Sequence, residues 1–455
     1  MLTKQLINQF NTQTPRYTSY PTVPAWTSSI GPGDYQQILT RYSQSDRPLS
    51  IYIHLPFCEK MCYYCGCNVV IKKTRREIGD TYLDYLENEV RLLTSFLNAR
   101  PPVLQLHFGG GTPNYLSNSQ ISRLFVILHR AFEILPSAEI SIEIDPRTIT
   151  HEQIRHYPTL GINRLSMGIQ DFDPSVQVAV NRVQSLDSVM RIFDWARSAS
   201  IDSINIDLIY GLPLQTRHSF LNTMTAVNQL SPDRIALYSY AHVPWLKSHQ
   251  RLINESDLPS PEDKVDIFLM ARDYLLSHDY DAIGMDHFAR SNDELSRAYS
   301  NGTLYRNFMG YTTKPADDYI GLGVSSIGFL NNLYIQNTPD LDTYYQSLDS
   351  NQLPTYRGFQ LSQDDIIRHA VINTLMCQFK LDKHTFNNQW RISFDDYFSS
   401  CLDELSYYSD TGLIEIKPGS LFITDLGRLF IRNIVHCFDN TSPRPNNQSM
   451  FSKAI

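Results

Sequence analysis

The stretch SIYIHLPFCEKMCYYCGC, residues 50–67, decides the fold class of this chain. It begins with a short apolar run, residues 50–55, which predicts a β-strand. After a proline, the chain enters a loop that holds four of its seven cysteines within ten residues. A strand that ends in a loop rich in reactive side chains is typical of parallel α/β folds, which bind ligands at the carboxyl ends of their strands.

The same strand-then-helix unit recurs along the chain. Residues 80–97 place apolar side chains at steps of three and four, which predicts a helix with Asp80 as its N-cap, and Ser117 precedes a second such pattern. Further strand-like runs lie at residues 103–108, 139–145, 163–168, 203–209 and 234–240. This alternation predicts about six βα units, joined by right-handed crossovers into a parallel sheet.

Two of the predicted strands have one polar face. Residues 140–145 read ISIEID and residues 204–208 read INIDL, so that Glu143 and Asp207 alternate with isoleucines. A flat sheet covered by helices on both faces has almost continuously apolar strands. We therefore expect an α/β fold in which a partial, open parallel βα barrel curves around a ligand.

The rest of the chain predicts two flanking parts. Prolines, hydroxyls and aromatic residues without a period fill residues 12–22, which indicates an extended N-terminal arm over residues 1–35. The barrel and its extension are expected over residues 36–350. The βα rhythm then stops, and a helical pattern that starts at Ser362 begins a mainly helical C-terminal domain, placed at residues 351–455.

Composition excludes several classes of protein. The net charge of −8 argues against a general nucleic-acid or membrane-surface binder, because both partners are polyanions. No apolar run approaches the ~20 residues of a membrane helix. The first ten residues lack the features of a signal peptide, so a cytoplasmic location is expected. Cys377, Cys401 and Cys437 are scattered and are interpreted as core thiols.

The cysteine cluster itself allows three kinds of site. A structural zinc site draws its ligands as two separated pairs, and a second pair is absent from the sequence. A redox dithiol would use Cys62 and Cys65 and leave Cys58 and Cys67 unexplained. Thiolates spaced x3 and then x2 can hold three corners of a cubane iron–sulfur cluster and leave one iron open. The iron–sulfur interpretation is favoured, with zinc and redox sites as the alternatives.

The spacing Cys58-x3-Cys62-x2-Cys65 resembles the signature of the radical S-adenosylmethionine superfamily. Within it, Cys67 and the arm sequence RYTSYPT at residues 16–22 are similar to the oxygen-independent coproporphyrinogen III oxidases, and haem chaperones lack both. Further runs that resemble this family lie at residues 109–113, 143–146, 167–172, 207–213, 284–290, 306–308 and 310–313.

The resemblance implies a set of cofactor-binding residues. Cys58, Cys62 and Cys65 would hold a 4Fe-4S cluster, and Cys67 is predicted not to be a ligand. Two molecules of S-adenosylmethionine are implied. The positions that match the first site are Tyr52, Gly110, Glu143 and Ile327. The positions that match the second site are Tyr64, Gly111, Thr112, Gln170, Arg182, Asp207 and Ala241.

The resemblance also implies an activity. A 5′-deoxyadenosyl radical would take a β-hydrogen from the propionates on rings A and B of coproporphyrinogen III. Loss of carbon dioxide and an electron would then leave the vinyl groups of protoporphyrinogen IX. Arg16, Arg290 and Arg306 are candidates to bind the substrate carboxylates, since arginine binds them bidentately, and Tyr20 is a possible substrate contact.

The implied partners are the porphyrinogen and an electron donor of flavodoxin or ferredoxin type, and a monomer is expected. Two other functions stay open at this point. One is a haem chaperone, and the other is a different radical enzyme that acts on tetrapyrroles. Fold alone does not separate them, because function depends on the site.

Overall fold

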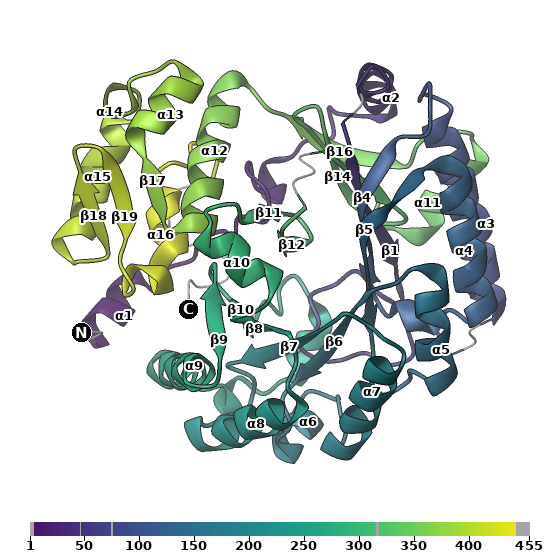
Figure 1. The fold of residues 1–455 in the computed structure, drawn as a ribbon, viewed down its shortest axis with the longest axis horizontal. Coiled ribbons are helices and arrows are strands. Elements are labelled where there is room, and N and C mark those ends of the chain that lie inside the picture. Colours follow the sequence, from purple (N-terminus) through teal and green to yellow (C-terminus); the bar gives the residue numbers. More distant parts are fainter. Residues whose placement is uncertain (1–3, 46, 74–75, 315–317, 443–455) are drawn as a thin grey trace.

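A curved sheet of twelve strands forms the centre of the protein (Figure 1). The structure is a computed structural model that describes residues 4–45, 47–73, 76–314 and 318–442. The strand order is β16-β15-β14-β13-β1-β4-β5-β6-β7-β8-β10-β9. The strands are β1 (Leu49–Leu55), β4 (Pro102–Gly110), β5 (Glu133–Ile144), β6 (Arg164–Gln170), β7 (Ser203–Tyr210), β8 (Arg234–Ser239), β9 (Tyr280–Ile283), β10 (His287–Arg290), β13 (Tyr319–Leu322), β14 (Ile327–Leu330), β15 (Leu333–Asn337) and β16 (Thr355–Gln360).

The six predicted strands are confirmed as β1 and β4 to β8, and they pair in parallel. A seventh strand, β13, adds to the free edge of β1 in parallel, with Tyr52 opposite Gly321. Antiparallel strands extend the sheet beyond β8 and beyond β13. The strand order has two ends, so the barrel is open, as the sequence predicted.

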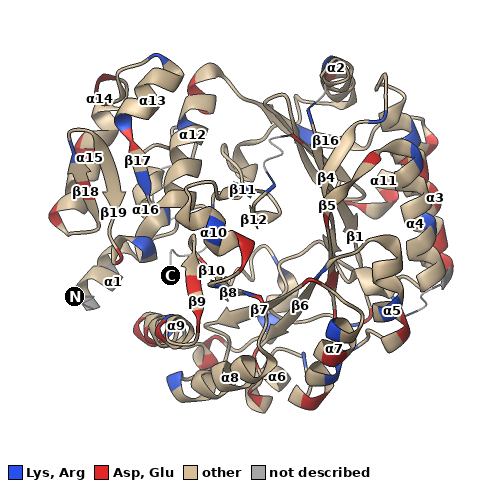
Figure 2. Ribbon diagram, in the orientation of Figure 1, with Lys and Arg blue, Asp and Glu red and all other residues tan. Residues whose placement is uncertain are grey.

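Helices cover the outer face of this sheet (Figure 1). They are α2 (Pro32–Tyr42), α3 (Arg76–Thr94), α4 (Asn118–Ala131), α5 (His151–His156), α6 (Pro174–Ala179), α7 (Leu186–Ser198), α8 (Arg217–Leu230), α9 (Pro261–Leu276) and α11 (Leu341–Asp349). The helix α10 (Glu294–Ser300) lies inside this ring, where Glu294 binds Arg164 and Arg234 (Figure 1). Figure 2 shows charged residues along α3, α4 and α7. Apart from α6 and α10, which pack in smaller apolar clusters, these helices share one large core with the strands.

The helix caps test the sequence interpretation locally. Ser117 is the N-cap of α4, where its hydroxyl and the Gln120 side chain form a capping box. The prediction for Asp80 is wrong, because α3 begins at Arg76 and Asp80 lies within its second turn. The carboxylate of Asp80 instead accepts a hydrogen bond from Gln120 Nε2 at 2.9 Å, which joins α3 to α4.

The C-terminal part has a core of its own. It contains α12 (Gln363–Gln378), α13 (Lys383–Trp390), α14 (Phe394–Tyr397), α15 (Ser399–Asp410), α16 (Ile431–His436) and a small sheet of β17 (Lys380–Asp382), β18 (Ile414–Lys417) and β19 (Ser420–Ile423). Ser362 caps α12 as expected. The large sheet continues to β16, past the expected boundary at residue 350, and this core begins with α12.

The N-terminal arm lies against the C-terminal core. Ile7, Phe10, Tyr17 and Tyr20 are all buried in that core. The arm is also not extended throughout, because it contains the short helix α1 (Lys4–Phe10), which places Ile7 and Phe10 on one face. Among the residues described, no helix is long and apolar enough to cross a membrane.

Candidate active site

The cysteine loop lies at the carboxyl end of β1, between two short strands, β2 (Phe57–Cys58) and β3 (Val70–Ile71). Neighbouring segments hold the loop through its backbone. The Tyr63 amide donates to Val180 O at 3.0 Å, and Asn181 Nδ2 donates to Met61 O at 2.8 Å. The loop conformation is therefore fixed by the protein and does not depend on its thiols alone.

A cavity of about 300 Å³ opens beside this loop, inside the curve of the sheet. Four thiols, two arginines and three carboxylates line it together. The predicted site residues on its wall are Cys58, Cys62, Tyr64, Cys65, Gly110, Gly111, Thr112, Glu143, Gln170, Arg182 and Asp207, with Cys67 beside them. The fold thus gathers residues from β4, β5, β6 and β7 around the cysteine loop.

Three of the predicted cofactor-binding residues do not line this cavity. Tyr52 stacks on His107 with their ring centroids 5.9 Å apart, and His107 in turn contacts Glu143, so Tyr52 lies one layer behind the wall. The carbonyl of Ala241 accepts from Gln250 Nε2 at 3.3 Å. Ile327 lies in a separate apolar cluster with Trp26.

Cationic and hydroxyl groups surround the thiols. Arg147 Nη2 and Arg182 Nη1 each lie 3.5 Å from Cys62 Sγ, and Thr112 Oγ1 lies 3.2 Å from Cys58 Sγ. A hydrogen bond from Cys67 lowers the pKa of Cys65 to about 6. Thiolates are the form that binds metal, so the two guanidinium groups favour ligation at Cys62, whereas burial raises the pKa of the Cys58 thiol.

Glu143 is held in a defined orientation at the cavity wall. Its two carboxylate oxygens contact His107 Nε2 and the Gly110 amide, each at 3.2 Å. Burial opposes ionisation, but these two partners outweigh it and lower the pKa of Glu143. Its side chain is still 40% exposed, so the carboxylate can bind a further group in the cavity.

Only glycine fits at the two positions before Thr112, because a side chain there would collide with neighbouring atoms. A Cβ on Gly111 would lie 2.6 Å from the backbone of Pro56, closer than real contacts allow. Gly110 has φ of +110°, which side chains rarely adopt, and its Cβ would meet His54. The cysteine loop and this turn therefore pack directly backbone to backbone, with the Thr112 amide donating to Phe57 O at 2.9 Å.

Two polar side chains on the cavity wall, Gln170 and Asp207, have acceptor atoms available for a ligand. Gln170 Oε1 is buried without a hydrogen-bond partner among the described residues, although such atoms are normally paired. Asp207 accepts from Asn205 at 2.9 Å, and burial together with the charge of Glu143 raises its pKa to about 6. An unpaired amide oxygen and a carboxyl group on the same wall can both accept hydrogen bonds from a polar, cationic ligand.

The site also fits an iron–sulfur cluster. Within the described part of the chain, no three His, Cys, Asp or Glu side chains gather closely enough to hold a single metal ion. A cubane differs from one ion, because each of its three cysteines binds a separate iron and the sulfurs lie farther apart. Three thiols on one loop, with arginines beside Cys62, suit that larger group.

The arginine candidates for substrate binding separate into two places. Arg16 binds Asp286 at 2.7 Å and lies over the ring of Tyr238, which lines the cavity. Arg306 lies nearby and donates to the carbonyls of Tyr17 and Arg16. Arg290 contacts Ser231 at the opposite ends of the strands. Arg147 and Tyr238 are wall residues that sequence reasoning missed; Arg147 directly follows the quoted run at residues 143–146.

An open parallel barrel with three cysteines on the loop after its first strand defines a radical S-adenosylmethionine protein, and residues 52–227 match the Radical SAM superfamily model. Residues 361–430 match the model described as the HemN C-terminal domain. The chain is 44% identical to the oxygen-independent coproporphyrinogen III oxidase of Escherichia coli over 99% of its length and 98% of the relative's. It is 43% identical to that of Synechocystis over 99% and 97%.

A solved structure agrees with these relatives. The structure titled as coproporphyrinogen III oxidase (HemN) from Escherichia coli, a radical SAM enzyme, superposes with a TM-score of 0.90 at 44% identity. The match covers 94% of this chain and 98% of that one. The chain therefore belongs to the family of oxygen-independent coproporphyrinogen III oxidases.

Proposed function

We propose that this chain catalyses the oxidative decarboxylation of coproporphyrinogen III to protoporphyrinogen IX without oxygen, as a step of porphyrin and haem biosynthesis. The observation that carries the proposal is the cavity of about 300 Å³, in which four thiols face a polar wall, in a chain so similar to these oxidases. When bound, the cluster and S-adenosylmethionine supply the electron and the radical that start the reaction.

The chain's own residues bind and orient these groups. Cys58, Cys62 and Cys65 hold the cluster, and Glu143 with the Gly110 backbone binds the amino group of the first cosubstrate. Glu143 suits this role because it is oriented by two hydrogen bonds and still exposed to the cavity.

A second cosubstrate would lie farther along the wall. Gln170, Arg182 and Asp207 supply an unpaired amide oxygen, a guanidinium and a carboxyl group there. Tyr64 offers a ring for stacking. Tyr52, Ala241 and Ile327 do not line the cavity and would act through their neighbours or through their backbone.

The substrate carboxylates need cations, and Arg16 and Arg306 are the better candidates, because they lie near Tyr238 and the arm. Tyr20 remains a candidate substrate contact. It lines a small cavity of about 30 Å³ with Arg306, where its hydroxyl donates to Asn440 at 2.7 Å. Arg290 is less suited, because it contacts Ser231 far from the cavity.

We further expect a monomer in the cytoplasm, with an electron donor of flavodoxin or ferredoxin type. Reducing conditions suit the loop, since they keep its four thiols from forming disulfides.

The experiment is an anaerobic assay of the reconstituted protein with S-adenosylmethionine, a reductant and coproporphyrinogen III. Formation of protoporphyrinogen IX together with methionine and 5′-deoxyadenosine is expected. Cosubstrate cleavage without that product would mean a different tetrapyrrole substrate. Tight haem binding without any cleavage, in protein with a full cluster, would favour a chaperone.

A further inference from the structure

A segment after β8 lies directly on the cysteine loop. We define it as the 242–252 segment, from His242 to Leu252. Its Lys247 Nζ donates to Cys67 O at 3.2 Å, and Gln250 Nε2 donates to Tyr64 O at 3.0 Å. His249 Nε2 lies 2.7 Å from Cys65 O. Three side chains within four residues thus contact the backbone that carries the candidate cluster ligands.

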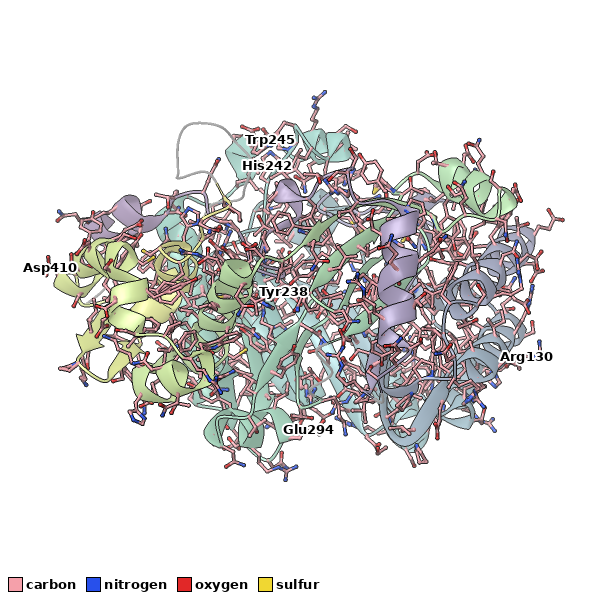
Figure 3. All side chains as sticks on the ribbon, turned by 90° about the horizontal axis from the view of Figure 1, so that it is seen from above. Arg130, Tyr238, His242, Trp245, Glu294 and Asp410 are labelled. Atoms are coloured by element: carbon pink, nitrogen blue, oxygen red, sulfur yellow. The ribbon has the colours of Figure 1, made fainter. Side chains whose placement is uncertain are left out.

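The same segment exposes large apolar side chains. Trp245 is 49% exposed, Leu246 64% and Leu252 63%. Figure 3 places Trp245 and His242 at one edge of the molecule, with Glu294 at the opposite edge and Tyr238 between them. Among the residues found on the wall of the 300 Å³ cavity, none comes from this segment. Its apolar side chains therefore face outward, which fits a protein partner better than a small ligand.

The segment is also locally basic in an acidic chain. Residues 241–254 contain Lys247 and Arg251 and no Asp or Glu, whereas the whole chain has a net charge of −8. The next acidic residue, Glu255, contacts His242 at 3.3 Å. An apolar centre with basic neighbours suits an acidic partner, because the positive charges steer the encounter and the apolar groups hold the complex.

We propose that the 242–252 segment is the docking surface for an acidic one-electron carrier protein, of flavin or iron–sulfur type. This inference rests on the proposed function, in which a cluster on the adjacent loop must be reduced from outside. In the step, the carrier loses one electron and the cluster gains it, and no bond forms or breaks. Such complexes are transient and small, below about 1,200 Å² of buried surface, so the docking surface for a carrier does not need to be large.

The position of the patch supports electron delivery. Electron transfer rates fall steeply with distance, so a productive carrier has to bind near the cluster. From the patch, His249 leads by one hydrogen bond to the backbone of Cys65, and Lys247 leads by another to that of Cys67. The docking side chains themselves, Trp245, Leu246 and Arg251, do not take part in these contacts to the loop.

The test compares two reductants on two matched variants of the reconstituted holoenzyme. One variant is Leu246→Ser with Arg251→Glu, and Trp245→Ala is a second, milder one. The control is Val126→Ser with Arg130→Glu on α4, which likewise removes one exposed apolar group and reverses one exposed charge. Cosubstrate cleavage is measured with dithionite and with a limiting amount of reduced flavodoxin or ferredoxin, and the Kd of each oxidised carrier is measured at several salt concentrations.

Both docking variants should cleave the cosubstrate normally with dithionite and about tenfold more slowly with the limiting carrier, and their Kd should rise by about tenfold. The wild-type Kd should rise with salt, and less so in the charge-reversed variant. The control variant should match the wild type throughout.

Three results would overturn the proposal. One is an equal loss with both reductants, which would assign the segment a role in holding the cysteine loop. Another is no difference between docking variants and control, or no binding of either carrier to wild type at low salt. The third is self-association of the chain that is lost in Trp245→Ala, which would make the patch a contact between copies. The test measures cosubstrate cleavage and carrier binding, and neither depends on the porphyrin product. A failure to convert coproporphyrinogen III would therefore refute the proposed function and leave this test valid.

Discussion

Two regions of the molecule bury charged groups, and they do so with opposite results. At the cavity wall, Glu143 keeps 40% of its side chain exposed and faces a space of about 300 Å³. At the junction between the arm, the barrel and the C-terminal core, Asp286 is only 11% exposed and lies beside a space of about 40 Å³.

At the junction, the charges neutralise one another. Asp286 binds Arg16 and His287, each at 2.7 Å, and despite burial these partners hold its pKa well below the usual range. Arg432 Nε donates to Pro15 O at 2.9 Å, and burial beside Arg16 lowers the pKa of Arg432 to about 9. The comparison teaches that a charged group still exposed to a cavity can bind a ligand there, and that charged groups paired with one another hold segments of the protein together.

The largest expected effect is at the cluster ligands. Cys58→Ser, Cys62→Ser and Cys65→Ser should each lose the cluster and essentially all cosubstrate cleavage, because three ligands are the minimum the site offers. Cys67→Ser should keep its iron. Iron and sulfide per chain after anaerobic reconstitution measure this, with circular dichroism to show that the fold is retained. Loss of the cluster in Cys67→Ser would contradict the assignment.

The next effect is on stability at the junction. Asp286→Asn should destabilise the protein by about 2 kcal/mol, because it leaves Arg16, which is 35% exposed, without its counter-charge. Since folding lowers the pKa of Asp286, its contribution is present above the ordinary Asp pKa of about 4. That contribution is lost as pH falls further, so wild type and variant should converge in acid. Denaturant unfolding measures both.

A surface aspartate provides the control for this prediction. Asp425 is 82% exposed and lies 3.6 Å from Arg428, so Asp425→Asn should change stability by less than about 1 kcal/mol. Cosubstrate affinity should be unchanged in both variants. A weakened affinity in Asp286→Asn would mean that the junction also shapes the cavity, and would break the distinction between the two regions.

A smaller effect is expected at the cavity wall. Glu143→Gln should weaken the binding of S-adenosylmethionine by about tenfold to thirtyfold, since a charge-assisted hydrogen bond becomes a neutral one. The free energy of unfolding should stay close to that of wild type, because this side chain is partly exposed. Equilibrium dialysis on the cluster-loaded protein measures the affinity. A large loss of stability would show that Glu143 serves the fold.

The smallest effect concerns pH. The pKa of Asp207 is raised to about 6, so this carboxyl is largely protonated at pH 5 and ionised at pH 7. A cationic cosubstrate beside it should bind severalfold more tightly as pH rises through 6. In Asp207→Asn this part of the pH dependence should disappear. Titration of the affinity from pH 5 to 8 measures it, and an unchanged profile in the variant would remove Asp207 from the binding site.

Local signals in the sequence predicted much of this structure. The six parallel strands follow from short-range pattern, as do the caps at Ser117 and Ser362. The alternation around Glu143 and Asp207 correctly indicated a polar cavity, and most predicted site residues lie on its wall. These features depend on neighbours in the chain, so the sequence shows them directly.

The rest depends on contacts between distant residues. β13 is only four residues long and pairs with β1 across more than 260 positions, which no local pattern reveals. Asp80 resembles a cap but bonds to Gln120 on another helix. The burial of Tyr17 and Tyr20 likewise requires the C-terminal core, and the aperiodic arm sequence gave no sign of it.

The late arrival of β13 has a consequence for biosynthesis. On the ribosome, one edge of β1 is covered as soon as residues 103–110 emerge, but its other edge waits for Tyr319–Leu322. At 5–20 residues per second, that delay lasts roughly 10 to 40 s. During this interval the nascent chain presents an unpaired strand edge, a known template for aggregation, next to four free thiols. The chain should therefore need protection by chaperones until its last parallel strand has been translated.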